Sequence, residues 1–348
     1  MKNFFFGSIF GVLILVGLIA MCLCSCVLLM FASLQSIGGT QQPKFVGPLY
    51  SYSKGNPNSE NKILVIKVEG TILTQRPSDS LSALLSTDVV YGYDIKQQFI
   101  DAAEDDTIKG VVLYVNSPGG TITGSKAIAD GIAYYKEVTG KSVVGVGSGL
   151  VASGGYWAIS TTDSIYLDPG STIGSIGVIF GPITRYNNVI SNNDVMTTDG
   201  ITEEYITSGE GKDIGNPYRD LTSEERDILQ KSVDNAYADF VTLVSTARGI
   251  PEDTIRNQIG AHIYDDKQAL EFGLIDFVAN IDDSIADFAS VLNISEDYQI
   301  VTQERELGFF ETLLGVSAKS SGTLKVDTIC NNLNSSLVIE ESYLKACN

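Results

Sequence analysis

Histidine is almost absent from this sequence, and its scarcity narrows the chemistry that the chain can perform. His262 is the single histidine among 348 residues. A Ser-His-Asp triad would need that one imidazole to fold back onto a serine nucleophile. A metallohydrolase would need further histidines, and no HExxH spacing occurs. We therefore interpret His262 as a packing or surface residue, and we expect no metal.

Positive charge is also scarce. Lysine and arginine together number 23 against 42 acidic residues, a formal net charge of −19, and they form no long cluster. This balance excludes nucleic acid as an expected partner and argues against a surface that lies flat on anionic lipid. The acidity itself is typical of a solubility property.

Cysteines are few, and most lie in one apolar segment. Cys22, Cys24 and Cys26 occur at alternate positions, which scatters them around a helix instead of converging them on a metal, so packing or lipidation is favoured. Cys330 and Cys347 could pair in an oxidising compartment, and the sequence leaves their redox state open.

Charge is absent from Phe4 to Leu34, and the stretch Ile9 to Phe31 is long enough to cross a bilayer as a helix. A secretory signal peptide is the alternative, but its apolar region normally has about 7–15 residues and is followed by a cleavage site of small residues. We predict a retained single-pass anchor in residues 1–37. Lys2 and Lys44 weakly favour a cytoplasmic N-terminus, with the rest of the chain on the outer side of the cell membrane.

The remaining chain divides by composition. Residues 38–61 are rich in Gly, Pro, Gln, Ser and Asn and indicate a linker, residues 62–294 form the expected globular domain, and residues 295–348 are an irregular C-terminal extension. Short apolar strands separated by helices predict an α/β fold with a largely parallel sheet. The expected strands span 63–68, 111–115, 142–146, 164–167 and 274–278, and the expected helices span 94–104, 123–136 and 265–272.

A long helix should follow Thr222 and end near Arg248. Thr222 with Glu225 three residues later is typical of a capping box. The predicted buried face is formed by Ile228, Leu229, Val233, Phe240, Val241 and Val244.

One glycine-rich stretch, from Gly147 to Ala158, carries the candidate nucleophile. Ser153 stands where an apolar strand ends and a helix would begin, and small neighbours would let a bound backbone approach its hydroxyl. The alternative is a turn with an N-cap serine. A second turn, Asn116 to Gly120, could present bare backbone amides, although taken alone it is an ordinary turn.

A base for Ser153 must then be sought among the lysines. A lysine deprotonates a serine only when neutral, which requires its pKa to fall from about 10.4 toward 7–8 through burial among apolar groups. Composition does not select one lysine. Lys212 lies in the loop Ser208 to Asp213, and its spacing fits a solvated loop residue as well as it fits a general base.

The order of the motifs resembles the signal peptide peptidase A family in its short, single-domain form, from about Ile63 to Val278. The motifs that carry the resemblance are Asn116-Ser117-Pro118-Gly119-Gly120, Ser153-Gly154-Gly155-Tyr156-Trp157, Gly174-Ser175-Ile176-Gly177-Val178 and Ser208-Gly209 with Lys212-Asp213. One departure is His262, which stands where members commonly carry arginine.

The resemblance implies a Clp-protease/crotonase-like superhelix of strand-strand-helix units with a Ser-Lys dyad. Ser153 matches the nucleophile, Lys212 the general base and Ser175 the serine that orients the lysine amine. The amides of Gly119 and Gly154 match the oxyanion-hole donors. No cofactor is implied.

The resemblance also implies a homo-oligomeric ring, an octamer, in which neighbouring subunits complete each dyad. The implied substrates are cleaved signal peptides left in the membrane. Three alternatives remain: a membrane serine protease of the stomatin-cleaving class, whose lysine follows the serine more closely; a crotonase-like enzyme acting on an acyl-coenzyme A; and a non-catalytic ring-forming membrane scaffold.

Overall fold

The computed structural model describes residues 50–77, 88–183, 191–192, 195–196 and 205–303. The predicted membrane anchor, all five cysteines and the chain beyond residue 303 lie outside these ranges. Within the described ranges, no helix is long and apolar enough to span a bilayer. The division of the chain into four segments remains a prediction.

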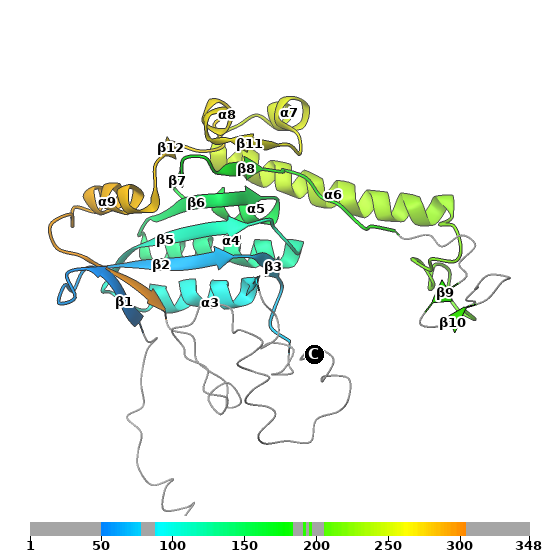
Figure 1. The fold of residues 1–348 in the computed structure, drawn as a ribbon, viewed down its shortest axis with the longest axis horizontal. Helices are drawn as coiled ribbons and strands as arrows, with labels where there is room; N and C mark the ends of the chain where they lie inside the picture. Colours follow the sequence, from blue (N-terminus) through cyan, green and yellow to red (C-terminus); the bar gives the residue numbers. More distant parts are fainter. Residues whose placement is uncertain (1–49, 78–87, 184–190, 193–194, 197–204, 304–348) are drawn as a thin grey trace, which may run out of the picture. The chain divides into compact units, whose positions relative to one another are not determined.

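The described core is a mixed α/β fold built on one largely parallel sheet (Figure 1). Its strands follow the order β1-β13-β2-β5-β6-β7-β12, and every pair from β13 to β12 is parallel. This confirms the predicted α/β class with a largely parallel sheet. The strands are β1 (Tyr50–Gly55), β2 (Lys62–Glu69), β5 (Ile108–Ser117), β6 (Val143–Ala152), β7 (Ser164–Leu167), β12 (Phe277–Val278) and β13 (Gln299–Gln303), with β8 (Thr172–Gly174) and β11 (Ile263–Asp265) off this path.

The sheet runs past both limits that composition suggested for the globular domain. β1 lies within the segment expected to be a linker, and β13 lies within the expected C-terminal extension. β13 pairs in parallel with β2, and β1 pairs antiparallel with β13. Neither strand carries a long apolar run, so composition alone gives no sign of their place in the sheet.

Alternate side chains of the central strands face two separate apolar layers. Leu64, Ile66 and Val68 of β2 belong to the layer that includes the helices α3 (Gly92–Ala103) and α4 (Ile122–Thr139). Ile63 and Val65 face the opposite layer, which includes α9 (Ile281–Val291). This period of two, with both faces buried, explains why these strands read as continuous apolar runs.

The long helix begins with the cap that the sequence predicts. α6 (Ser223–Arg248) begins with the predicted capping box between Thr222 and Glu225, and Gly249, whose φ is 69°, caps its C-terminus.

The shorter elements are β3 (Thr71–Leu73), β4 (Val89–Tyr91), α5 (Gly154–Ile159), β9 (Ser191–Asn192), β10 (Val195–Met196), α7 (Glu252–Thr254), a π-helix at Ile255–Ile259 and α8 (Asp266–Glu271).

The predicted buried face of α6 is correct only for its C-terminal half. Phe240, Val241 and Val244 are buried, and the Phe240 ring lies 4.7 Å from that of Trp157 on α5. Ile228 is 58% exposed, so its predicted burial is wrong. A helix of 26 residues is about 39 Å long, and only its C-terminal half packs on the described core.

The strand expected over residues 274–278 is also shorter than predicted. Only Phe277 and Val278 pair, with β7, whereas Leu274 and Ile275 are buried without joining a strand. Burial of a short apolar run does not by itself make a strand, because buried irregular segments are equally apolar.

Candidate active site

The site begins where β6 changes its pairing partner. Residues 144–147 of β6 pair with β7, whereas residues 150–152 pair with β8. Gly149, with a φ of 69°, lies at the change, and this left-handed conformation is one that glycine adopts readily. The end of β6 therefore lies between β5 and β8, and the carboxyl ends of three strands meet there.

Ser153 follows β6 directly and precedes α5, so the predicted strand-to-helix turn is confirmed. Its backbone has φ 52° and ψ −119°, a strained conformation for a residue with a side chain. The Ser153 amide donates to Gly174 O at 2.9 Å, and its carbonyl accepts from the Trp157 amide at 2.9 Å. The side chain is half-buried, and within the described chain its Oγ has no hydrogen-bond partner.

The turn after β5 lies against this serine. A β-carbon on Gly119 would lie 2.7 Å from Gly154 N and 2.8 Å from Ser153 Cβ, and the φ of Gly119 is 100°. A β-carbon on Gly154 would lie 2.2 Å from Ser125 Oγ. Gly119 therefore requires glycine, because the backbone of the serine turn blocks a β-carbon there, whereas at Gly154 the nearest obstacle is the Ser125 side chain of α4.

The backbone amides at the glycine junction, where the turn of Gly119 and Gly120 lies against Gly154, differ in their hydrogen bonds. Gly119 N–H donates to Ser117 Oγ at 3.1 Å, and Ser117 Oγ donates in turn to Gly70 O at 2.6 Å. Gly154 occupies the first turn of α5, where backbone amides have no partner within the helix. Gly120 N also lies at the junction, 3.2 Å from the β-carbon position on Gly154.

Ser175 lies beside Ser153 through the pairing of β6 with β8. It follows Gly174, the residue whose carbonyl accepts from the Ser153 amide, and its own amide donates to His262 O at 2.7 Å. Its φ is 55°. Among the described non-glycine residues four have positive φ, and two of these are Ser153 and Ser175. Such strained residues cluster at functional sites.

Lys212 is not brought to Ser153 within the described chain. It is exposed, in a run of turns beside the N-terminus of α6, where a β-carbon on Gly211 would lie 4.0 Å from Glu225 Oε1. Phe240, which contacts Trp157 on α5, lies 15 residues beyond Glu225, so the two positions are about 22 Å apart along α6. No ion pair or hydrogen bond of Lys212 Nζ occurs in the described ranges.

His262 contributes its backbone to the site but not its ring. β11 pairs antiparallel with β8, which places the His262 carbonyl on the Ser175 amide. The residue is exposed, and its ring lies 6.4 Å from that of Tyr264 in an edge contact. Within the described chain the imidazole makes no hydrogen bond to Ser153, in keeping with the surface interpretation.

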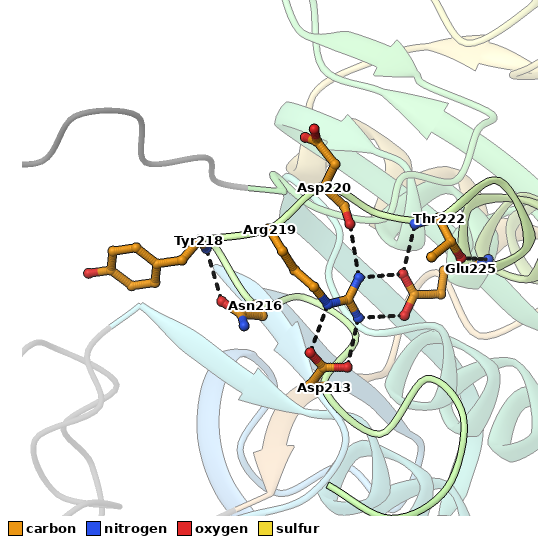
Figure 2. Close-up of polar contacts among 7 residues, drawn as sticks. All are labelled: Asp213, Asn216, Tyr218, Arg219, Asp220, Thr222 and Glu225. Carbon is orange, nitrogen blue, oxygen red and sulfur yellow. Dashed lines mark hydrogen bonds and ion pairs between the residues drawn. The ribbon is translucent and has the colours of Figure 1, made fainter. Parts of the chain in front are cut away.

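An ion-pair network, which the sequence did not reveal, holds the loop that carries Lys212 (Figure 2). Arg219 donates from Nε and Nη2 to Asp213, both at 2.7 Å, and from Nη1 and Nη2 to Glu225 at 2.8 and 2.6 Å. Nη1 also donates to Asp220 O at 2.9 Å. These bonds use all five guanidinium N–H groups.

The network shifts the titration of its members. The Arg219 guanidinium holds the pKa of Asp213 below its ordinary value and, with the Thr222 amide, lowers the pKa of Glu225 to about 2. The two carboxylates raise the pKa of Arg219 further. The capping box predicts that Glu225 lies at the start of the helix. No sequence pattern predicts which carboxylates pair with Arg219, because Arg219 lies in a loop.

The comparisons with known proteins agree with this geometry. Residues 136–295, which include Ser153, Ser175 and Lys212, match the model of peptidase family S49. Over these residues the chain is similar to peptidase family S49. Residues 86–164 also match the Clp protease model, in agreement with the largely parallel sheet. This similarity, with that of the relatives below, confirms the predicted resemblance and the predicted enzyme class, a serine peptidase.

Three relatives show how far the similarity extends. A protein of Methanocaldococcus jannaschii described as a protease is 34% identical over 195 residues, which is 56% of this chain and 60% of the relative. A protein of Enterococcus faecium named as a signal peptide peptidase, SppA, is 29% identical over 78% of this chain and 75% of its own length. Protease 4 of Salmonella typhi is 31% identical, and the chain spans only 37% of it.

Proposed function

We propose that the chain is an S49 peptidase and, more closely, a membrane-anchored endopeptidase that hydrolyses cleaved signal peptides with a Ser153-Lys212 dyad. The observation that supports the nucleophile most is the strained backbone of Ser153 at the end of β6, with its hydroxyl half-buried and unpaired in the described chain. A strained serine between glycine turns can present Oγ to a bound peptide backbone. In its finer detail, we expect the fold to be the Clp-protease/crotonase-like superhelix.

The proposed reaction is acyl transfer to water. Neutral Lys212 takes the proton of Ser153 Oγ, which attacks the peptide carbonyl, and the amides of Gly154 and Gly119 hold the resulting oxyanion, with the Gly119 amide exchanging its bond to Ser117 Oγ for one to the oxyanion. Protonated Lys212 then gives its proton to the leaving amine. Lys212 next removes a proton from water, hydroxide attacks the acyl-enzyme, and the proton returns to Ser153 Oγ. Ser175 orients the lysine amine by a hydrogen bond.

A neighbouring subunit supplies Lys212 in this proposal. The first turn of α6, beside Lys212, lies about 22 Å along the helix from Phe240, which contacts α5, and this separation supports a dyad completed between two chains. A head-to-tail ring, which we propose to be an octamer, would bring each lysine to the next serine. The exposed Ile228 on the N-terminal half of α6 suits such a contact.

The proposed substrates and location rest on the predicted anchor and on one relative. An uncharged helix at Ile9 to Phe31 would hold the enzyme beside the bilayer, with its catalytic domain on the extracytoplasmic side. The Enterococcus faecium relative carries the name signal peptide peptidase. Signal peptide remnants are apolar segments that remain in the membrane, where such an enzyme would meet them.

The test is cleavage of a synthetic signal peptide by the full chain in detergent. We expect activity from the natural protein and none from Ser153→Ala or Lys212→Ala, with all three equally folded by circular dichroism. A folded natural protein that cuts no peptide would instead favour a scaffold or an acyl-coenzyme A enzyme. Retained activity in Lys212→Ala would show that the dyad is assigned wrongly.

A further inference from the structure

Arg219 links two parts of the chain that would otherwise be joined only by a flexible loop. Its guanidinium binds Asp213, the residue after Lys212, and also binds Glu225 in the first turn of α6. Glu225 is 6% exposed and is itself fixed, because its carboxylate accepts from the Thr222 amide at 2.9 Å in the capping box. The lysine loop is thereby tied to a helix end.

The loop has little apolar packing of its own. Backbone bonds from Lys212 to Gly209, from Ile214 to Gly211 and from Asn216 to Asp213 form successive turns, and Ile214 is 39% exposed. Turns of this kind with an exposed surface open easily. The charged network is therefore the main described interaction that fixes the loop on α6.

The network also pairs Asp213, the acidic residue next to Lys212, with Arg219. Both oxygens of Asp213 accept from Arg219, at 2.7 Å each. Within the described ranges Lys212 Nζ has no acidic partner, although Asp213 is adjacent in sequence. A carboxylate that already has a guanidinium partner competes less for the ammonium group.

We infer that Arg219 is a positioning residue for Lys212, holding its loop on α6 and keeping Asp213 from pairing with it. This inference rests on the proposed function, since it gives Lys212 the role of general base. Arginine is required because its planar fork supplies five donors to three acceptor groups, whereas lysine offers three donors from one nitrogen. The proposal assigns Arg219 no contact with substrate.

The test measures kcat and KM of the full chain in detergent against a synthetic signal peptide. Arg219→Met should lower kcat about 10²-fold with KM little changed, as expected for a misplaced catalytic group. Arg219→Lys should fall between this variant and the natural protein. Arg226→Met is the matched control, because Arg226 is exposed in the first turn of α6 and its side chain has no partner in the described chain. This variant should retain full kcat.

A pH profile separates this role from a general loss of stability. In Arg219→Met, two unpaired carboxylates would favour the protonated lysine, so the acid limb of kcat/KM should move upward by about one pH unit. Asp213→Asn in the same chain should move the limb back. The charged groups on the loop and the first turn of α6 are Glu210, Asp213, Arg219, Asp220, Glu224, Glu225 and Arg226.

The outcomes distinguish this inference from the proposed function. Activity in Lys212→Met would overturn the proposed function and this inference with it. An inactive Lys212→Met beside an Arg219→Met of unchanged kcat and pH profile would overturn the inference alone. If Arg219→Met does not fold, Arg219→Lys and Glu225→Gln decide: a lower kcat and a shifted acid limb support the inference, and natural values in both overturn it.

Discussion

The turn that carries Ser153 and the loop that carries Lys212 are held by different interactions. Ser153 is fixed by backbone bonds to β8 and α5, and the residues after it, from Gly154 to Ser160, are all buried. Lys212 is exposed, and its loop is held by turns and by the Arg219 ion pairs. The comparison shows one half of the proposed dyad built into the core and the other built on the surface.

This difference suits a site completed on assembly. A nucleophile needs a fixed position against the oxyanion donors, and close packing provides it. A lysine supplied across an interface must be exposed before assembly and well oriented after it. A polar network with one guanidinium at its centre provides that orientation without a core.

The largest effect should follow removal of the serine hydroxyl. Ser153→Ala should lower kcat by about 10⁶-fold, the size of loss found when a nucleophile is removed. Its thermal unfolding should be unchanged, because the described Oγ makes no hydrogen bond. Ser223→Ala, at an exposed serine of α6, is the control for peptide cleavage. Residual activity near the natural level in Ser153→Ala would place the nucleophile elsewhere.

The two halves of α6 should respond differently to truncation. Phe240→Ala removes a buried ring that packs against Trp157 in a tilted arrangement and should cost about 3–5 kcal/mol of unfolding free energy. Ile228→Ala, at an exposed position, should lie within about 0.5 kcal/mol of the natural protein. Urea unfolding of the dissociated chain measures both. Equal losses would mean that the N-terminal half is also packed.

The glycine junction should be intolerant of a single methyl group. Gly119→Ala places a β-carbon 2.7 Å from Gly154 N and should lower kcat about 10²-fold by displacing the serine turn. Gly140→Ala is the matched control, since its φ is also positive but nothing lies within 4 Å of the added carbon. We expect it to lose about 1–2 kcal/mol of stability and no activity. Full activity in Gly119→Ala would remove this junction from the site.

The smallest effect concerns acid stability at the lysine loop. The pKa of Glu225 is lowered from 4.5 to about 2, so its contribution to folding is present above pH 4.5 and is lost as the pH falls toward 2. Glu225→Gln should flatten the fall of unfolding free energy in that window. Chemical unfolding at a series of pH values measures it, with Glu224→Gln as the exposed control. Identical pH slopes would contradict the network.

Much of the serine half could be predicted from sequence because its signals are local. An apolar strand that ends in small residues predicts a strand-to-helix turn, and Ser153 lies there. On the lysine side, the capping box likewise predicts the start of α6, and the structure confirms it. Each of these patterns depends on residues within a few positions of one another.

The features that sequence did not reveal depend on distant partners. β13 is a strand because β2 lies beside it, and its own five residues carry no decisive pattern. Ile228 has the spacing of a core residue, yet in the described chain it is 58% exposed. Arg219 acts through the positions of Asp213 and Glu225, six residues to either side, which only the folded loop brings together.

Mixed assembly tests the central claim, a dyad shared between subunits, most directly. Ser153→Ala and Lys212→Ala chains are each expected to be inactive, but co-expression should produce rings in which about a quarter of the sites pair an intact Ser153 with a neighbour's intact Lys212. The account predicts that peptide cleavage returns to about that fraction of the natural activity. If the mixed rings form and stay inactive, each dyad lies within one chain and the account is contradicted.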